Sequence, residues 1–125
     1  MAIVTAGCAD PTAPTTPTPA VPTITDTFSD TLLVGGANLH RFTVTAIGGV
    51  KVSLPSVQPG AAVGIGVGTP SQLSCSVIDQ VLEAVAGTTI LLSGTATLPG
   101  SYCVTIFDLG KLVEPAVYTI NVLHS

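Results

Sequence analysis

The stretch Gly100-Ser101-Tyr102-Cys103-Val104-Thr105-Ile106-Phe107-Asp108 decides the fold class of this chain. It begins with the second residue of a Pro-Gly pair, which is a turn signal. Side chains of an extended strand alternate between two faces, so Tyr102, Val104 and Ile106 share one face. The opposite face carries Cys103, Thr105 and Phe107. Because both faces hold apolar or sulfur groups, the pattern predicts a strand inside a sheet rather than at its edge.

The same alternation recurs along the chain, with turn residues between the alternating segments. We expect seven or eight strands, near residues 24–28, 39–46, 50–54, 63–67, 75–82, 88–97, 100–108 and 116–123. Gly48-Gly49 predicts a tight hairpin turn between the second and third of these segments. The sequence therefore predicts an all-β protein, an antiparallel β-sandwich of jelly-roll or Ig-like topology over residues 23–125.

One of these segments has an unusual face. Val63-Gly64-Ile65-Gly66-Val67-Gly68 places branched apolar side chains on one side and only glycine on the other. A face without side chains allows another backbone or side chain to approach closely. We therefore expect a close contact against this glycine face.

Residues 73–86 fit two kinds of secondary structure. Leu73, Val77, Val81 and Val85 recur at helical spacing, whereas residues 75–79 also alternate as in a strand. The neighbouring strands favour a strand over residues 75–82, and a helix is the alternative.

The composition indicates an extracellular type of β-protein. Charged residues are 8% of the 125 residues, against about a quarter in an average soluble protein. The net charge is -4, and the three cations Arg41, Lys51 and Lys111 are scattered along the chain. A nucleic-acid partner requires a basic patch, so we expect no nucleic-acid binding.

Residues 1–8 resemble the end of a bacterial lipoprotein signal. They finish with Thr5-Ala6-Gly7-Cys8, where small residues precede a cysteine as in a lipobox. The lipobox usually has Leu where this chain has Thr5, and a full signal adds a basic and an apolar region. We expect lipidation at Cys8 and hence a membrane anchor; the alternative is a free cysteine in a disordered terminus.

Residues 9–22 form a segment rich in Pro and Thr. This composition favours an extended polyproline II spacer that reaches roughly 40 Å at about 3.1 Å per residue. The order of cysteine, spacer and β-domain predicts export to the bacterial cell envelope. The protein would be lipid-anchored at the outer membrane or cell surface, or secreted.

The three cysteines suggest one disulfide and one lipidation site. In an oxidising compartment two of the three are expected to pair, and lipidation would use the third. We therefore predict a disulfide between Cys75 and Cys103, on neighbouring strands. Two buried free thiols are the alternative.

No motif for catalysis or metal binding stands out. The sequence has no Gly-x-Ser-x-Gly nucleophile elbow, and its cysteines and histidines lack zinc-ligand spacing. We expect His40 and His124 to be solvated residues at strand ends. We expect no catalytic residue, no bound metal and no cofactor.

The loop of residues 108–115 is the candidate binding loop, because sandwiches commonly present function on end loops. The residues proposed for contact are Asp108, Lys111, Leu112 and Glu114. Apolar residues in such a loop form a contact surface or fold under the sandwich as a plug, and the plug is the preferred interpretation.

Over residues 23–124 the chain resembles the bacterial pre-peptidase C-terminal domain. The resemblance rests on Thr27-Phe28-Ser29, His40-Arg41-Phe42-Thr43-Val44, Val63-Gly64-Ile65-Gly66-Val67, Pro99-Gly100-Ser101-Tyr102-Cys103-Val104 and Tyr118-Thr119-Ile120-Asn121-Val122. It implies a jelly-roll-like sandwich of the kind found beside secreted peptidase domains and in cell-surface proteins, and not itself catalytic. Family members often have acidic residues in the fourth strand, where this chain has Gly64 and Gly66, so the resemblance does not extend to ion contact there.

These features together predict a non-catalytic bacterial cell-surface lipoprotein module with a structural or adhesive role. Its expected partners are the membrane, through lipid on Cys8, and a surface protein or a polysaccharide. The alternative, implied by the resemblance, is an accessory domain of a secreted hydrolase that aids folding or substrate docking.

Overall fold

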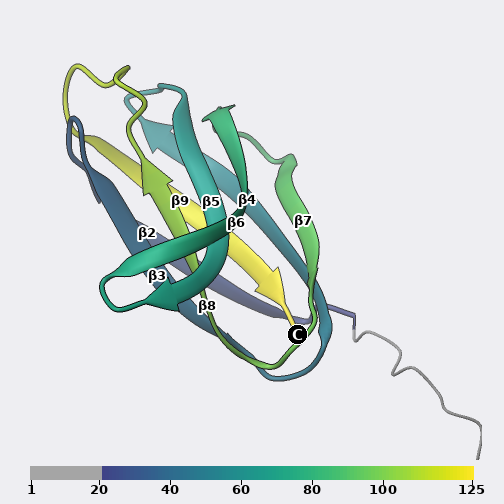
Figure 1. Cartoon of the computed structure of the whole chain (residues 1–125). Helices are drawn as coiled ribbons and strands as arrows, with labels where there is room; N and C mark the ends of the chain where they lie inside the picture. The colour runs from purple at the N-terminus through teal and green to yellow at the C-terminus, as the bar shows by residue number, and fades with distance from the viewer. Residues whose placement is uncertain (1–20) are drawn as a thin grey trace, which may run out of the picture.

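A computed structural model describes residues 21–125, which form eight β-strands in two sheets (Figure 1). The strands are β2 (Ile24–Leu32), β3 (Ala37–Val44), β4 (Gly48–Gln58), β5 (Val63–Ser71), β6 (Ser74–Ala84), β7 (Ile90–Ala96), β8 (Gly100–Phe107) and β9 (Ala116–His124). The all-β prediction is confirmed. Within this part of the chain no helix is long and apolar enough to cross a membrane. The predicted lipobox with Cys8, and residues 9–20 of the predicted spacer, lie outside the described residues.

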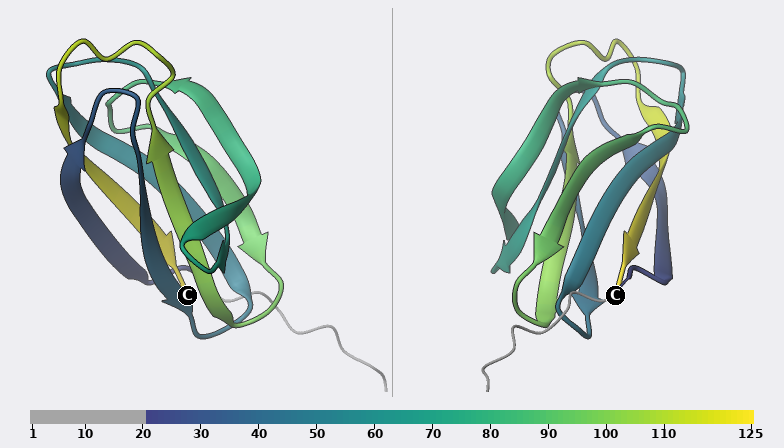
Figure 2. Two further views of the ribbon diagram at one scale, coloured as in Figure 1. Left: turned by 60° about the vertical axis from the view of Figure 1, so that its left-hand side comes forward. Right: turned by 90° about the vertical axis from the view of Figure 1, so that its right-hand side faces the viewer.

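The two sheets pack face to face as a sandwich (Figure 2). One sheet has the order β2-β9-β4-β7 and the other β3-β8-β5-β6, and every neighbouring pair is antiparallel. Successive strands alternate between the sheets, except β5 and β6, which form a hairpin. This connectivity is that of a jelly roll, so the jelly roll is the topology adopted of the two predicted.

The hairpin predicted at Gly48-Gly49 is wrong. Both glycines belong to β4, where they pair with Ala96 and Thr95 of β7. Strands β3 and β4 lie in different sheets, so the chain crosses between the layers just before Gly48. A Gly-Gly pair indicates a nearby turn, but it does not determine which sheet the next strand joins.

The core lies between the sheets and consists mostly of aliphatic side chains. On β9, Tyr118, Ile120 and Val122 are fully buried, because every second side chain of the strand faces the core. Strand β8 lies between β3 and β5, which confirms the prediction of an interior strand, and its Val104 and Ile106 are buried in the core.

Strand β6 confirms the strand assignment for residues 75–82 and rejects the helix. Its pairing with β5 shifts register between Val67 and Gly68, which leaves Ile78 as an extra residue. Such a bulge bends the strand that carries it. The start of β6 lies across the sheet that contains β3 and β8 (Figure 1).

The glycine face of β5 makes the close contacts that the sequence predicts. A Cβ on Gly68 would lie 1.8 Å from the carbonyl oxygen of Ser76, so only glycine allows β6 to approach this closely. A Cβ on Gly64 would lie 2.1 Å from the ring of Phe107, which covers that glycine.

A disulfide joins Cys75 and Cys103, whose Cα atoms are 5.9 Å apart. The predicted pairing is confirmed, but its placement on neighbouring strands is wrong, because β5 lies between β6 and β8. The bend of β6 brings Cys75 over β5, and Cys103 is fully buried beneath it. Arg41 of β3 donates a hydrogen bond to the carbonyl oxygen of Gln72, which lies at the tip of the hairpin formed by β5 and β6.

Candidate functional site

One long side of the sandwich, between edge strands β2 and β3, is closed by aromatic and polar contacts. The rings of Phe28 on β2 and His40 on β3 are stacked, with centroids 4.8 Å apart. Tyr118 Oη lies 2.6 Å from His40 Nε2 and accepts a hydrogen bond of 3.0 Å from Asn38 Nδ2. Asn38 also donates to the carbonyl oxygen of Thr31 at 2.9 Å. These contacts join the two sheets along this side.

The prediction of two solvated strand-end histidines is wrong, because His124 ends β9 but is buried, and His40 lies within β3 and is half-buried. Desolvation lowers the pKa of His40 from its ordinary value, while the negative charge of Asp30 acts in the opposite direction. His124 is 2% exposed, and its Nε2 lies 2.7 Å from Asp26 Oδ2. Its ring also packs against Phe42, with centroids 5.2 Å apart. Packing and hydrogen bonds therefore hold both imidazoles, His124 buried in the sandwich and His40 half-buried at its side.

The predicted binding loop is organised by Asp108. Its Oδ2 accepts a hydrogen bond of 2.8 Å from the backbone N–H of Gly35. Its Oδ1 accepts from the N–H groups of Gly110, Lys111 and Leu112 at 2.9, 3.0 and 3.1 Å. The hydrogen bond from Gly35 is the main cause that lowers the pKa of Asp108, and the other three act in the same direction. Asp108 therefore shapes the loop, because its carboxylate is occupied by backbone donors.

The other three residues of the predicted loop site point to different surroundings. Leu112 is only 6% exposed and belongs to the core, so it fills the end of the sandwich as the preferred interpretation expects. Lys111 donates a hydrogen bond to Glu83 at 2.5 Å. Glu114 is exposed, and its neighbour Val113 is 90% exposed. The four residues do not converge on one pocket.

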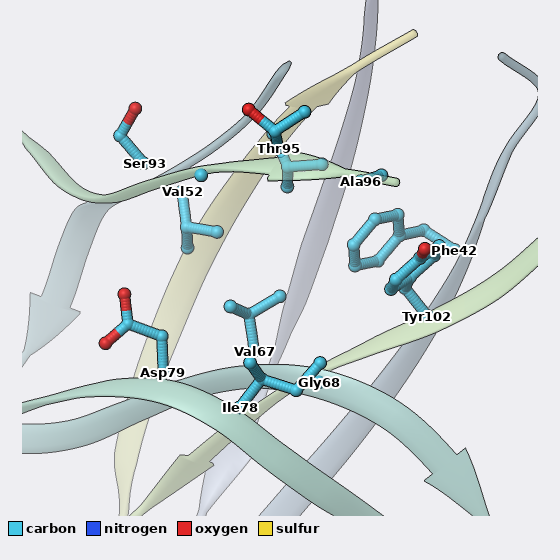
Figure 3. Close-up of a pocket in the computed structure, with 12 residues that line it drawn as sticks. Phe42, Val52, Val67, Gly68, Ile78, Asp79, Ser93, Thr95, Ala96 and Tyr102 are labelled. Atoms are coloured by element: carbon cyan, nitrogen blue, oxygen red, sulfur yellow. The ribbon is translucent and has the colours of Figure 1, made fainter. Parts of the chain in front are cut away.

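The opposite long side, between edge strands β6 and β7, contains a cleft that the sequence did not predict (Figure 3). Its volume is about 190 Å³. Aliphatic and aromatic side chains from both sheets make up most of its wall, among them Phe42, Val52, Val67, Ala96 and Tyr102. The aromatic and polar contacts between β2 and β3 close one side of the sandwich, and the accessible apolar space lies on the other side, between β6 and β7.

Gly94 helps to explain why this space is not filled. It pairs with Val50, which is buried, so by strand alternation a side chain at position 94 would face the interior. A Cβ built on Gly94 has no neighbouring heavy atom within 4 Å. Leu92 and Ala96, two residues away on either side, are buried and fill the core. Gly94 has no side chain, so the space between them stays open.

Among residues 21–125, Asp79 is the one charged residue that lines the cleft. It pairs with Val67 across β5 and β6, and its carboxylate projects from β6 toward β7 (Figure 3). Its Oδ1 accepts a hydrogen bond of 2.9 Å from the N–H of Gln80. Within residues 21–125 the ion pairs are Lys111–Glu83 and His124–Asp26, so Asp79 takes part in none.

Strand β6 also exposes apolar side chains along the free edge of its sheet. Ile78 is 73% exposed, Leu82 is 54% exposed, and Val85, just after the strand, is 64% exposed. The outer edge of β6 has no strand partner among the described residues. A free edge presents unpaired N–H and C=O groups that can pair with another extended segment.

No protein-family model matches the chain, and no curated protein matches its sequence. The resemblance to the pre-peptidase C-terminal domain therefore stays a prediction. Within residues 21–125 no group of three or more His, Cys, Asp or Glu side chains is arranged to hold a metal ion.

Proposed function

We propose that this protein is a non-catalytic binding module of the bacterial cell envelope, anchored by lipid on Cys8 and displayed on the Pro/Thr-rich spacer. The Cys75–Cys103 disulfide supports export, because structural disulfides persist mainly in oxidising compartments. The contacts of half-buried His40 with Tyr118 and of buried His124 with Asp26 support structural roles for the two histidines.

The free edge of β6 carries the proposal. It is an 11-residue strand at the end of its sheet, with Ile78 and Leu82 exposed. Exposed apolar groups beside unpaired backbone donors and acceptors suit strand addition, in which an extended segment of another protein joins the sheet. The strand has no Lys, Arg or Pro, which often protect an edge from such pairing, so its protection is limited to the bulge at Ile78 and to the acidic residues Asp79 and Glu83.

The expected partner is an extended segment of a surface protein with apolar and basic side chains. The apolar side chains would pack beside Leu82, and basic side chains would complement the net charge of -4. Backbone pairing would provide most of the affinity, and the side-chain contacts would select the sequence. A polysaccharide would not form the backbone ladder.

The test compares two exposed leucines in bacteria that display the full chain. Leu82→Lys places a charge on the β6 edge, whereas Leu98→Lys makes the same change at a residue 69% exposed in the turn before β8. The free energy of unfolding of both variants should stay within about 0.5 kcal/mol of the wild-type value. Only Leu82→Lys should reduce adhesion to protein-coated surfaces. Equal adhesion by both variants would remove the β6 edge as the contact, and adhesion to polysaccharide alone would favour a carbohydrate partner.

The anchor is tested separately with a fatty-acid probe in cells that express the gene with its native upstream region. The probe should label the wild-type protein and should not label Cys8→Ser. Equal labelling of both proteins would exclude Cys8 as the attachment site.

A further inference from the structure

We infer that the cleft between β6 and β7 binds a small organic ammonium ion, with its apolar ring between the sheets and its cationic group at Asp79. This inference is independent of strand addition at the β6 edge. It rests on the shape of the cleft, the nature of its walls and the position of its single charge.

The size and lining of the cleft suit one ring. Its volume is about 190 Å³, and an apolar cavity of about 150 Å³ is large enough to hold benzene. Phe42 and Tyr102, with ring centroids 6.1 Å apart, contribute aromatic surface at one end. Val52 and Val67 contribute aliphatic surface from opposite sheets (Figure 3). A ring placed here would replace water that has few hydrogen-bond partners in the cleft.

The charge of the ligand follows from Asp79. Its carboxylate projects toward β7 at the cleft, and it makes no ion pair with any residue of the described part of the chain. Two cations contact the β5–β6 hairpin: Lys111 is paired with Glu83, and Arg41 donates to the carbonyl oxygen of Gln72. A ligand with an ammonium group one or two bonds from a ring would place both groups together, whereas an anionic ligand would be repelled.

Asp79 is solvent-exposed at the cleft, and a charged residue on an edge strand also limits unwanted pairing. Protection of the strand edge does not require an open space beside the carboxylate. The cleft nevertheless extends to Gly94, where a Cβ would meet no atom within 4 Å. The combination of a vacant apolar volume and an unpaired carboxylate is what favours a ligand. The two roles differ in an experiment, because edge protection involves no small molecule.

The probe is benzylammonium chloride, titrated into the full-length chain while the backbone amides are followed by NMR. It should bind with a Kd of about 1 mM, as suits so small a ligand, and should shift the amides of Asp79, Gly94 and Ala96. Benzyl alcohol, which keeps the ring without the charge, should bind about fivefold more weakly. Benzoate should bind more weakly still. Equal binding of benzoate and benzylammonium, shifts confined to other regions, or no shifts at all would overturn the inference.

Substitutions at two positions, Asp79 and Gly94, localise the site. Asp79→Asn should weaken benzylammonium binding about fivefold and leave benzyl alcohol binding unchanged. Glu114→Gln removes an exposed carboxylate elsewhere and controls for net charge. Gly94→Leu fills the space and should weaken both probes at least tenfold while circular dichroism shows an unchanged fold; Gly94→Val provides the same test if the leucine variant does not fold. Normal binding by the folded Gly94 variant, or equal effects of Asp79→Asn and Glu114→Gln, would contradict the inference.

Discussion

Nε2 of His40 on β3 lies 2.6 Å from Oη of Tyr118 on β9, and this hydrogen bond is among those that connect the two sheets. Tyr118 is fully buried, and the same oxygen accepts a hydrogen bond from Asn38. The stacked ring of Phe28 covers His40 from the β2 side. This seam closes one side of the sandwich, whereas the side between β6 and β7 contains the cleft.

Tyr118→Phe should lower the free energy of unfolding by about 1–3 kcal/mol, because it leaves polar groups of His40 and Asn38 without their buried partner. Tyr102→Phe is the matched control, since the Tyr102 hydroxyl donates only to the exposed carbonyl oxygen of Leu98. Urea denaturation measures both variants. An equal loss of unfolding free energy in the two variants would show that the Tyr118 hydroxyl contributes no more to stability than the Tyr102 hydroxyl.

The stability of the protein should depend on the protonation of His40. Desolvation lowers the pKa of His40 in the folded protein below the ordinary value of 6.5. As the pH falls through about 6.5, the unfolded chain therefore binds a proton more readily than the folded protein, and stability decreases. In His40→Gln this part of the decrease should disappear, while the decrease due to acidic groups remains. The comparison is the free energy of unfolding from pH 8 to pH 5, and identical pH profiles would contradict the prediction.

Loss of the Cys75–Cys103 disulfide should lower stability by about 3.5 kcal/mol, the loop-closure value for its separation of 28 residues. The double variant Cys75→Ala/Cys103→Ala should melt at a lower temperature than the oxidised wild type. A reductant should lower the melting temperature of the wild type and leave that of the double variant unchanged. Peptide mapping that finds both thiols free after periplasmic expression would contradict the bond itself.

Leu112 and Val113 offer a direct test of the plug in the loop of residues 108–115. Leu112 is 6% exposed and Val113 is 90% exposed, although they are adjacent. Leu112→Asp should cost several kcal/mol, because it buries an unpaired charge. Val113→Asp should change stability by less than about 0.5 kcal/mol. Denaturant titrations in which the two variants behave alike would reject the burial of Leu112.

Two glycines should respond to alanine in opposite directions. Gly68→Ala should destabilise the protein by about 1–3 kcal/mol, because the new Cβ would overlap the carbonyl oxygen of Ser76. Gly94→Ala should be neutral or stabilise by about 0.4–1 kcal/mol, since its Cβ meets no atom and the unfolded chain loses freedom. Thermal unfolding of both variants checks the difference in sign.

Local patterns in the sequence predicted the strands better than their arrangement. The alternation in β5 and β8 gave the buried faces correctly, because a strand with period two has only two faces. The hairpin at Gly48-Gly49 failed because turn residues do not specify which sheet receives the next strand. The path of β6 across β5 depends on a bulge at Ile78, and a bulge needs a partner strand to be defined.

The candidate site was harder to predict than the fold. The loop around Asp108 was visible as a break in the strand pattern, but the burial of Leu112 depends on packing at the end of the sandwich. The cleft arises where Gly94 contributes no side chain to the interior. A glycine within an alternating strand was the only available signal, and its meaning depends on what faces it. Asp79 became a candidate only when its pairing with Val67 placed it on the inner face.

The disulfide also determines how the domain responds to mechanical force. If the domain is stretched between β2 and β9, tension passes directly from Cys75 to Cys103 and bypasses the intervening chain. That chain spans 28 residue steps, which corresponds to roughly 90 Å of extended length. Most of β6, all of β7 and the start of β8 therefore remain shielded from the load. Nearly all of the β6 edge and the β7 wall of the cleft belong to the part of the molecule that extension releases only after the bond is reduced, whereas the walls from β3, β4 and β5 lie outside it.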